Sequence, residues 1–355
     1  MKNVFFRVNA SVDIGIGHVM RCLALAKSLS INGLNCIFLI NEDHGGSCDL
    51  ISLEGFETYL ISQIETTNRS IKAYVEHDLS STINILRNYS SCFCLVVDHY
   101  DLDHTWEQSI SKYVESIVVI DDLVNRKHYC DVIVDSSFKR ETLEYKDLVP
   151  AKAKILTGSK YVLLRNEFIQ ARNLDTRFKI LNYPPKRILV NFGGSASDKI
   201  YLKVLKQLEQ SNLPNDVKVD IVLGPLNVKS EELLKAKLTS RLSVNTYVSV
   251  ECMSKMILAA DLCLGAVGST TWERFCLRRP SILTVLAPNQ LEGAKKLHSA
   301  GLVELFDPIN DYNLIGKIKE ITEEKMVKML LLAATLVDGL GCDRVTENIL
   351  NMRRS

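Results

Sequence analysis

Short continuous runs of apolar residues alternate with stretches of helical spacing along most of the chain. The first run covers residues 4–8, and apolar residues then recur at 19, 22, 23, 26 and 29, the spacing of one helix face. Helices are also predicted at 71–86 and from about 198 to 210. Runs typical of strands buried on both faces recur at 35–40, 92–97, 116–120, 132–134, 187–192, 218–223, 262–264 and 281–285. This alternation predicts an α/β fold with a parallel sheet in each half of the chain.

The regular pattern loosens between Tyr161 and Tyr183, and Pro184-Pro185 follows. A chain of 355 residues is too long for one ordinary core. We therefore expect two domains, at 1–165 and 183–340, with a last helix within 341–355 that crosses back to the first domain.

Composition narrows the range of functions. The chain is 46% hydrophobic and 24% charged, with a formal charge of +1, so it lacks the basic excess of a nucleic-acid binder. Residues 1–3 run directly into the first strand, and no apolar run is long enough to span a bilayer, so we expect a cytoplasmic protein without a membrane partner. We also expect a monomer. The ten cysteines fit reduced, mostly buried thiols; Cys92 and Cys94, two apart in a predicted strand, are expected to share a face, with a zinc or redox role as the lesser alternative.

The turn between the first strand and the first helix carries Gly15, Gly17 and His18. In an open α/β sheet this turn lies at the carboxyl edge, where ligands bind and where the helix start offers free N–H groups to an anion. An imidazole there can take a proton near neutrality. The turn predicts chemistry beside a bound phosphate, while the alternative is that His18 only caps or fills the helix start.

Polar residues also follow three later strands, as Asp98-His99-Tyr100, Asp121-Asp122 and Asp135. These side chains are candidates to orient a polar substrate, to hold a divalent metal, or to cap the next turn. His104 and His128 are expected at the surface.

The second half opens as the first does, with a strand, the turn 193–198 and a helix. After the strand at 262, Gly268, Ser269 and Thr270 are expected at a helix N-terminus that binds a diphosphate, and Glu273 is placed to accept hydrogen bonds from ribose hydroxyls. The alternative is that Thr270 and Glu273 form a capping box. Asn289-Gln290 stands at the next turn, within reach of the same ligand.

Taken together, these motifs resemble the hydrolases that act on UDP-2,4-diacetamido-2,4,6-trideoxy-β-L-altropyranose in pseudaminic acid biosynthesis. The resemblance spans nearly the whole chain, through Gly15-x-Gly17-His18-x-x-Arg21, 97–100, 120–123, 161–168, 192–195, 268–274 and 289–290. It implies a metal-independent GT-B-like fold, with two Rossmann-like domains that face a central cleft holding the substrate.

The same resemblance implies roles for particular residues, and no cofactor. His18 is the general base that activates water, and UDP leaves with inversion at the anomeric carbon. The implied substrate-binding residues are Gly17, Arg21, Asp98, His99, Tyr100, Gly194, Ser195, Gly268, Ser269, Thr270, Glu273, Asn289 and Gln290. A GT-B glycosyltransferase using a UDP-sugar donor is the alternative, although the loop 41–49 shows neither the apolar nor the basic patch of a lipid acceptor site. A nucleotide-sugar binding module is a third reading.

Overall fold

Each half of the chain builds its own parallel sheet. The computed structural model describes residues 2–9, 16–41, 47–61, 71–175, 181–193, 196–224, 231–248, 250, 252–308 and 313–352. It divides into one unit of Met1–Arg165 with Leu340–Ser355 and a second unit of Asn166–Gly339. None of the helices in these ranges is long and apolar enough to cross a bilayer.

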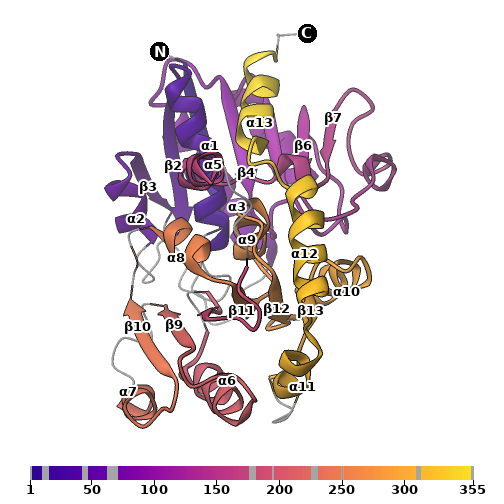
Figure 1. Cartoon of the computed structure of the whole chain (residues 1–355). Coiled ribbons are helices and arrows are strands. Elements are labelled where there is room, and N and C mark those ends of the chain that lie inside the picture. The colour runs from indigo at the N-terminus through magenta and orange to yellow at the C-terminus, as the bar shows by residue number, and fades with distance from the viewer. Residues whose placement is uncertain are drawn as a thin grey trace. The chain divides into compact units, whose positions relative to one another are not determined.

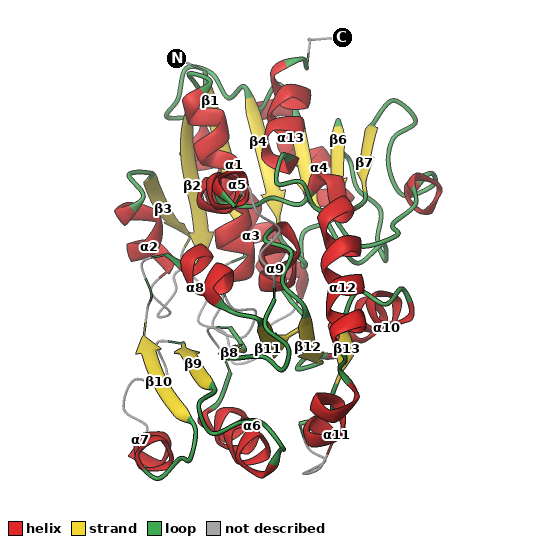
Figure 2. Cartoon of the chain, in the orientation of Figure 1, coloured by secondary structure: helices red, strands yellow, loops and turns green. Residues whose placement is uncertain are grey.

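The first unit holds seven strands in the order β3-β2-β1-β4-β5-β6-β7. Every pairing is parallel. The strands are β1 (Asn3–Val8), β2 (Asn35–Asn41), β3 (Glu57–Ile61), β4 (Cys94–Asp98), β5 (Ile117–Ile120), β6 (Val132–Asp135) and β7 (Lys154–Thr157). The helices are α1 (Gly17–Ile31), α2 (Ser47–Leu53), α3 (Ile71–Leu86) and α13 (Gly341–Leu350), labelled in Figure 1, and α4 (His104–Ile110), labelled in Figure 2. Short 3-10 turns are η1 (Ser111–Tyr113), η2 (Thr142–Tyr145) and η3 (Ser159–Tyr161).

Alternating side chains of the strands pack into two apolar clusters, one on each face of this sheet. Phe6 belongs to the cluster that includes residues of α1 and α13, whereas its neighbour Phe5 belongs to the cluster with α3 and α4. Helix α13 therefore completes the core of the first unit although it ends the chain. Thr346 of α13 also donates a hydrogen bond to the Ser28 hydroxyl of α1 (2.8 Å).

The second unit holds six strands in the order β10-β9-β8-β11-β12-β13, again with parallel pairings. These are β8 (Arg187–Asn191), β9 (Lys218–Leu223), β10 (Ser243–Val248), β11 (Leu262–Ala266), β12 (Ser281–Thr284) and β13 (Glu304–Leu305). The helices, seen beside the strands in Figure 2, are α5 (Asn166–Leu174), α6 (Asp198–Gln210), α7 (Glu231–Leu238), α8 (Met253–Ala259), α9 (Ser269–Cys276), α10 (Leu291–Ser299), α11 (Asn313–Glu320) and α12 (Glu323–Leu336), with the 3-10 turn η5 (Pro288–Gln290).

The predicted doubly wound α/β class is confirmed, and every predicted strand is present. Patterning missed β3, β7, β10 and β13, which are short or carry several polar residues. It also missed α5, which lies in the stretch where the regular pattern loosens.

Two expectations about side chains were wrong. Strand β4 begins at Cys94, so the strand alternation does not reach Cys92, and the two thiols pack into the clusters on opposite faces of the sheet. His128 is not at the surface: it is 3% exposed, and its Nδ1 lies 2.7 Å from Glu107 Oε1 in the core. His104 is exposed, as predicted.

The strand orders locate one distinctive place in each sheet. In the first unit the chain winds outward from β1 through β2 to β3, then returns to place β4 on the other side of β1. The second unit repeats this with β8 and β11. Ligands of open α/β sheets bind outside the carboxyl ends of the strands at such a switch point. The turns that carry Gly17 and Gly268 follow strands at these two points, β1 and β11.

Candidate active site

A histidine and a carboxylate meet at the switch point of the first unit. His18 lies in the first turn of α1, which follows β1, and Asp98 is the last residue of the adjacent strand β4. His18 Nδ1 lies 2.5 Å from Asp98 Oδ1. A carboxylate can only accept a hydrogen bond, so Nδ1 carries a hydrogen, and in the neutral imidazole Nε2 then keeps its lone pair. This is the arrangement that a general base needs.

An arginine one turn further along α1 keeps Asp98 ionised. Arg21 donates to both carboxylate oxygens, through Nε to Oδ2 (2.6 Å) and Nη2 to Oδ1 (2.5 Å). Burial opposes ionisation of Asp98, but the charges of Arg21 and His18 outweigh it and hold the pKa of Asp98 well below its usual range. The carboxylate is therefore charged at neutral pH and able to stabilise a protonated His18.

The geometry changes the role expected for Asp98. It is fully buried, and its oxygens accept hydrogen bonds from His18, Arg21 and the Cys22 thiol (3.4 Å). Asp98 therefore positions the histidine, and no substrate contact is needed to satisfy it. Arg21 also donates to Asp122 (3.2 Å), so its predicted contact with substrate competes with two carboxylates.

The next two residues of the predicted cluster have different surroundings. The Tyr100 ring meets the His18 ring edge-on, with centroids 4.7 Å apart, and its hydroxyl donates to Asp122 Oδ1 (3.0 Å). The His99 side chain is buried, and its Nε2 forms a hydrogen bond with the Tyr74 hydroxyl of α3 (3.0 Å). Tyr100 thus lies beside the candidate base, whereas the His99 side chain contacts helix α3. Gly17, the first residue of α1, precedes the histidine.

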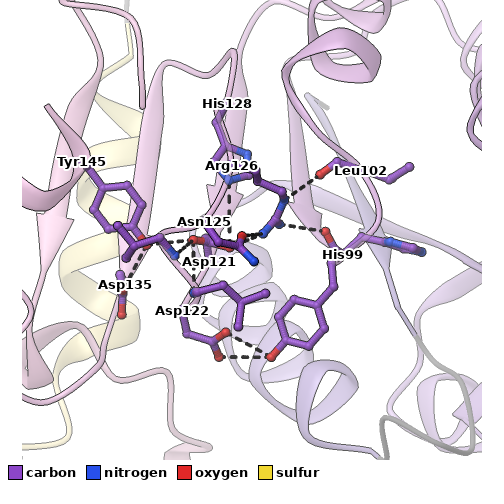
Figure 3. A network of polar contacts seen from close by, with 12 residues as sticks. His99, Leu102, Asp121, Asp122, Asn125, Arg126, His128, Asp135 and Tyr145 are labelled. Carbon is purple, nitrogen blue, oxygen red and sulfur yellow. Dashed lines mark hydrogen bonds and ion pairs between the residues drawn. The ribbon is translucent and has the colours of Figure 1, made fainter. Parts of the chain in front are cut away.

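The other strand-end carboxylates belong to a network of polar contacts, shown in Figure 3. Asp121, after β5, accepts hydrogen bonds from Val124 N (3.0 Å) and Arg126 Nη1 (2.8 Å). Asp135, at the end of β6, accepts from Ser137 N (2.8 Å) and Arg140 Nε (2.5 Å). Both act as turn caps, each with its own arginine, and this favours the third of the three predicted roles. No group of three or more potential metal ligands is assembled within the described ranges.

This network joins neighbouring loops at the same sheet edge. Arg126 donates to the carbonyls of His99 (3.1 Å) and Leu102 (3.1 Å), as Figure 3 shows, so the loop after β5 supports the loop after β4. The Tyr145 hydroxyl lies 2.9 Å from Asp121 and 2.8 Å from Asp135, with one hydrogen between two carboxylates. Burial raises the pKa of Asp135, while the charge of Arg140 and the hydrogen bonds from Ser137 and Tyr145 oppose that shift.

The second unit presents a helix N-terminus at its switch point. After β11, Gly268 caps α9 in an extended conformation, and its N–H donates to Thr271 Oγ1 (3.2 Å). The alternative capping box of Thr270 with Glu273 is therefore not formed. Gly268 and Ser269 are exposed and Thr270 is half-buried, as a helix start that binds an anion requires. Glu273 lies one turn further along α9 and is 9% exposed.

A buried arginine holds the strands beneath this helix start. Arg274 of α9 is 1% exposed and donates to Asn191 O at the end of β8 (2.8 Å) and to Ala266 O at the end of β11 (3.4 Å). A side chain on Gly265 would lie 2.2 Å from both Arg274 Nη2 and Asn191 O, so only glycine fits there. The sequence reasoning missed both roles, and the glycine inside an apolar strand was the available signal.

The remaining predicted residues have mixed outcomes. Asn289 is exposed in η5, whereas Gln290 accepts hydrogen bonds from Leu286 N (2.9 Å) and Ala287 N (3.3 Å) and so shapes its own turn. Gly193, after β8, has φ +91°, a conformation that favours glycine. Gly15, Gly194, Ser195 and most of the loop 41–49 lie outside the described residues.

Comparisons with known proteins fit the geometry. No protein-family model matches the chain. It is 24% identical over 282 residues to the UDP-2,4-diacetamido-2,4,6-trideoxy-beta-L-altropyranose hydrolase of Campylobacter jejuni, covering 78% of this chain and 88% of that protein. It is 25% identical over 289 residues to an uncharacterized protein of Methanocaldococcus jannaschii, covering 80% of this chain but 55% of that longer protein. The resemblance carried by the motifs is thereby confirmed.

Solved structures match over almost the full chain. MurG of Acinetobacter baumannii has a TM-score of 0.69 at 17% identity and covers 99% of this chain and 100% of that one. The chain has the GT-B fold. UDP-GlcNAc 2-epimerase of Neisseria meningitidis, bound to UDP-GlcNAc, has a TM-score of 0.64 at 14% identity, and Arabidopsis thaliana UGT89C1, complexed with UDP, has 0.63 at 12%. They cover 99% and 98% of this chain, respectively, and all of their own.

Proposed function

We propose that the protein is a UDP-sugar hydrolase that releases UDP from UDP-2,4-diacetamido-2,4,6-trideoxy-β-L-altropyranose. The contact that carries this proposal is the one between His18 Nδ1 and Asp98 Oδ1 at 2.5 Å, which leaves Nε2 as a base. The hydrolase relative names the substrate, and two structures of the same fold hold UDP or UDP-GlcNAc. These likenesses support a nucleotide-sugar enzyme, and the dyad supports activation of a hydroxyl group, which in a hydrolase is water.

In the proposed reaction, His18 Nε2 removes a proton from water while the water oxygen attacks the anomeric carbon. The bond between that carbon and the phosphate oxygen breaks, and its electron pair leaves with UDP. Attack from the face opposite UDP inverts the anomeric centre. Asp98 stabilises the imidazolium that forms, and Arg21 keeps Asp98 in place.

The second unit is proposed to hold the UDP. The exposed N–H groups at Gly268, Ser269 and Thr270 are suited to the diphosphate, and their donors stabilise its developing charge. Glu273 is proposed to accept hydrogen bonds from the ribose, and Asn289 to reach the sugar or phosphates. Since N–H donors supply the electrostatic stabilisation, the proposed step needs no metal.

The direct test measures the release of UDP from UDP-2,4-diacetamido-2,4,6-trideoxy-β-L-altropyranose by the purified protein, without acceptor or added metal. The His18→Ala variant is measured in the same way. We expect steady release by the wild type and a loss of at least about a thousandfold in the variant, whose affinity for UDP stays within twofold because the dyad lies in the other unit. UDP release only after addition of an acceptor alcohol would identify a glycosyltransferase instead. Binding without turnover, unaffected by His18→Ala, would identify a binding module.

A further inference from the structure

A second polar cluster lies at the same carboxyl edge of the first sheet, on the side of α3. Arg7 of β1 is fully buried, and its Nε donates to both carboxylate oxygens of Asp78 in α3 (3.2 and 3.0 Å). Its Nη1 donates to the carbonyls of Val8 (2.9 Å) and Leu39 (3.3 Å). Its Nη2 donates to Asp78 and, at 2.7 Å, to Asn41 Oδ1 at the end of β2. All five guanidinium hydrogens of Arg7 are thus engaged in hydrogen bonds. Because Arg7 can only donate, the Asn41 side-chain oxygen must face it, and this fixes the orientation of the amide.

The fixed amide points its nitrogen at a tyrosine. Asn41 Nδ2 donates to the Tyr74 hydroxyl at 2.9 Å. On the other side, His99 Nδ1 accepts from the backbone N–H of Asp101 (3.1 Å), so the ring hydrogen is on Nε2, which lies 3.0 Å from the Tyr74 oxygen and donates to it. Burial and the nearby charges of Arg7 and His18 hold the pKa of His99 well below its usual value, so the ring stays neutral with this single hydrogen.

A hydroxyl oxygen has two lone pairs and one hydrogen. Asn41 and His99 fill both lone pairs of Tyr74, and Arg7 Nη2, whose hydrogens go to Asp78 and Asn41, lies 3.3 Å from the same oxygen. Burial raises the pKa of Tyr74, so the hydroxyl keeps its hydrogen. Within the described part of the chain, no group accepts that hydrogen. Tyr74 is therefore preset as a donor that cannot accept.

The donor and the candidate base are held by neighbouring strand ends. Its partner His99 directly follows Asp98, the partner of His18, and Asn41 ends the strand next to β1. The Tyr74 ring is half-buried, 6.0 Å from the His99 ring. The two polar clusters thus lie at the same strand ends, on the α1 face and on the α3 face of the sheet. A sugar that extends from His18 across this carboxyl edge would meet both.

We propose that Tyr74 determines specificity for the sugar by donating its hydroxyl hydrogen to the carbonyl oxygen of an acetamido group. This inference rests on the proposed function, whose substrate carries two such groups. An amide carbonyl is a strong acceptor and has no hydrogen of its own, so it complements a donor whose lone pairs are filled. A free amine, protonated at neutral pH, offers only hydrogens and cannot make this bond.

The test measures binding in a His18→Ala background, where the substrate is not consumed. The probes are UDP, the diacetamido nucleotide sugar, and its two analogues in which one acetamido group is a free amine. We expect Tyr74→Phe to weaken binding of the diacetamido nucleotide sugar about tenfold and to leave the affinity for UDP within twofold. The variant should also bind one of the two amine analogues as tightly as it binds the diacetamido compound. Tyr113→Phe, which removes a surface hydroxyl bonded to Arg87, serves as the matched control.

A second variant keeps the tyrosine and redirects its hydrogen. In Asn41→Asp, one carboxylate oxygen still accepts from Arg7, and the other replaces the amide donor with an acceptor for the Tyr74 hydroxyl. We expect the same loss of preference as in Tyr74→Phe, an outcome that removal of packing alone would not produce. Melting temperatures of both variants check that the domain remains folded.

The inference is overturned if both folded variants keep the preference within twofold, if the sugar adds no affinity to that of UDP, or if UDP affinity falls in parallel. Turnover of the otherwise wild-type protein separates this result from the proposed function. UDP release that is unaffected by Tyr74→Phe would leave the hydrolase and remove Tyr74 from the sugar site. Tyr74-dependent binding without any UDP release would do the reverse.

Discussion

The proposed role of Asp98 predicts a large kinetic defect from a change of one atom. In Asp98→Asn, the amide must meet His18 Nδ1 on one side and two Arg21 donors on the other. If the amide nitrogen faces His18, Nδ1 has to accept and Nε2 carries the hydrogen, so the base is lost. If it faces Arg21, two donors are forced together. Neither orientation reproduces the native contacts.

The charge change adds to this defect. A carboxylate and an imidazolium with charge centres about 4 Å apart attract by about 4 kcal/mol at an effective dielectric of about 20. Arg21 already shares the Asp98 charge, so we take about half to all of that value as the loss in the transition state, which is roughly 30-fold to 1000-fold in kcat. The assay is steady-state UDP release at saturating substrate, with the fold checked by circular dichroism.

Asp135→Asn is the matched control, because this buried carboxylate at the end of β6 is also paired with an arginine but does not touch His18. We expect its kcat to stay within threefold of the wild type. Because Asp98 acts through His18, the double variant of Asp98→Asn with His18→Ala should be no slower than His18→Ala alone. A folded Asp98→Asn protein with kcat within threefold of the wild type would refute the dyad.

Three further predictions follow from the same contacts. Glu273→Ala should weaken UDP binding about tenfold to a hundredfold, measured by calorimetry, and leave kcat nearly unchanged. The control Glu292→Ala, at an exposed position, should leave UDP binding unchanged. An unchanged affinity in Glu273→Ala would remove Glu273 from the site. Gly265→Ala should lower the stability of the second unit by about 3 kcal/mol, or roughly 6 to 12 °C in Tm, because the new Cβ would overlap Arg274 and Asn191. Gly293→Ala in α10, with open space around it, should not lower Tm. Equal Tm values for the two variants would contradict the packing around Gly265. Since the folded pKa of His99 is depressed, the unfolded chain takes up a proton that the folded one does not, so stability is full above about pH 6.5 and falls as pH drops below it. His99→Gln should remove up to about 1.4 kcal/mol per pH unit of that slope in chemical denaturation between pH 6.5 and 5, and an unchanged slope would show that His99 does not titrate this way.

The sequence predicted the fold and the two switch-point turns because both depend on local order. Apolar runs separated by helical spacing define parallel strands, and a glycine turn after a strand places Gly17 and His18, or Gly268 and Ser269, at the sheet edge. Strand β10 and helix α5 were not predicted, because in a short, partly polar element the apolar residues show no clear periodicity.

Partners between side chains were harder to predict. Asp98 is predicted at the right edge of the sheet, but the pattern cannot show that His18 and Arg21, about 80 residues earlier, use its oxygens. The same holds for Arg274, whose acceptors are backbone carbonyls of two strands. The burial of His128 depends on Glu107, which lies in another element. Such pairings come from tertiary packing alone.

The most direct measurement of the central claim follows the oxygen of water. The protein is supplied with UDP-2,4-diacetamido-2,4,6-trideoxy-β-L-altropyranose in ¹⁸O-labelled water, and both products are analysed by mass spectrometry after a short reaction. Attack by a water activated by His18 at the anomeric carbon predicts one ¹⁸O in the sugar and none in UDP, with loss of product formation in His18→Ala. Label in UDP would place the cleavage at phosphorus, and no product without an added acceptor would contradict hydrolysis.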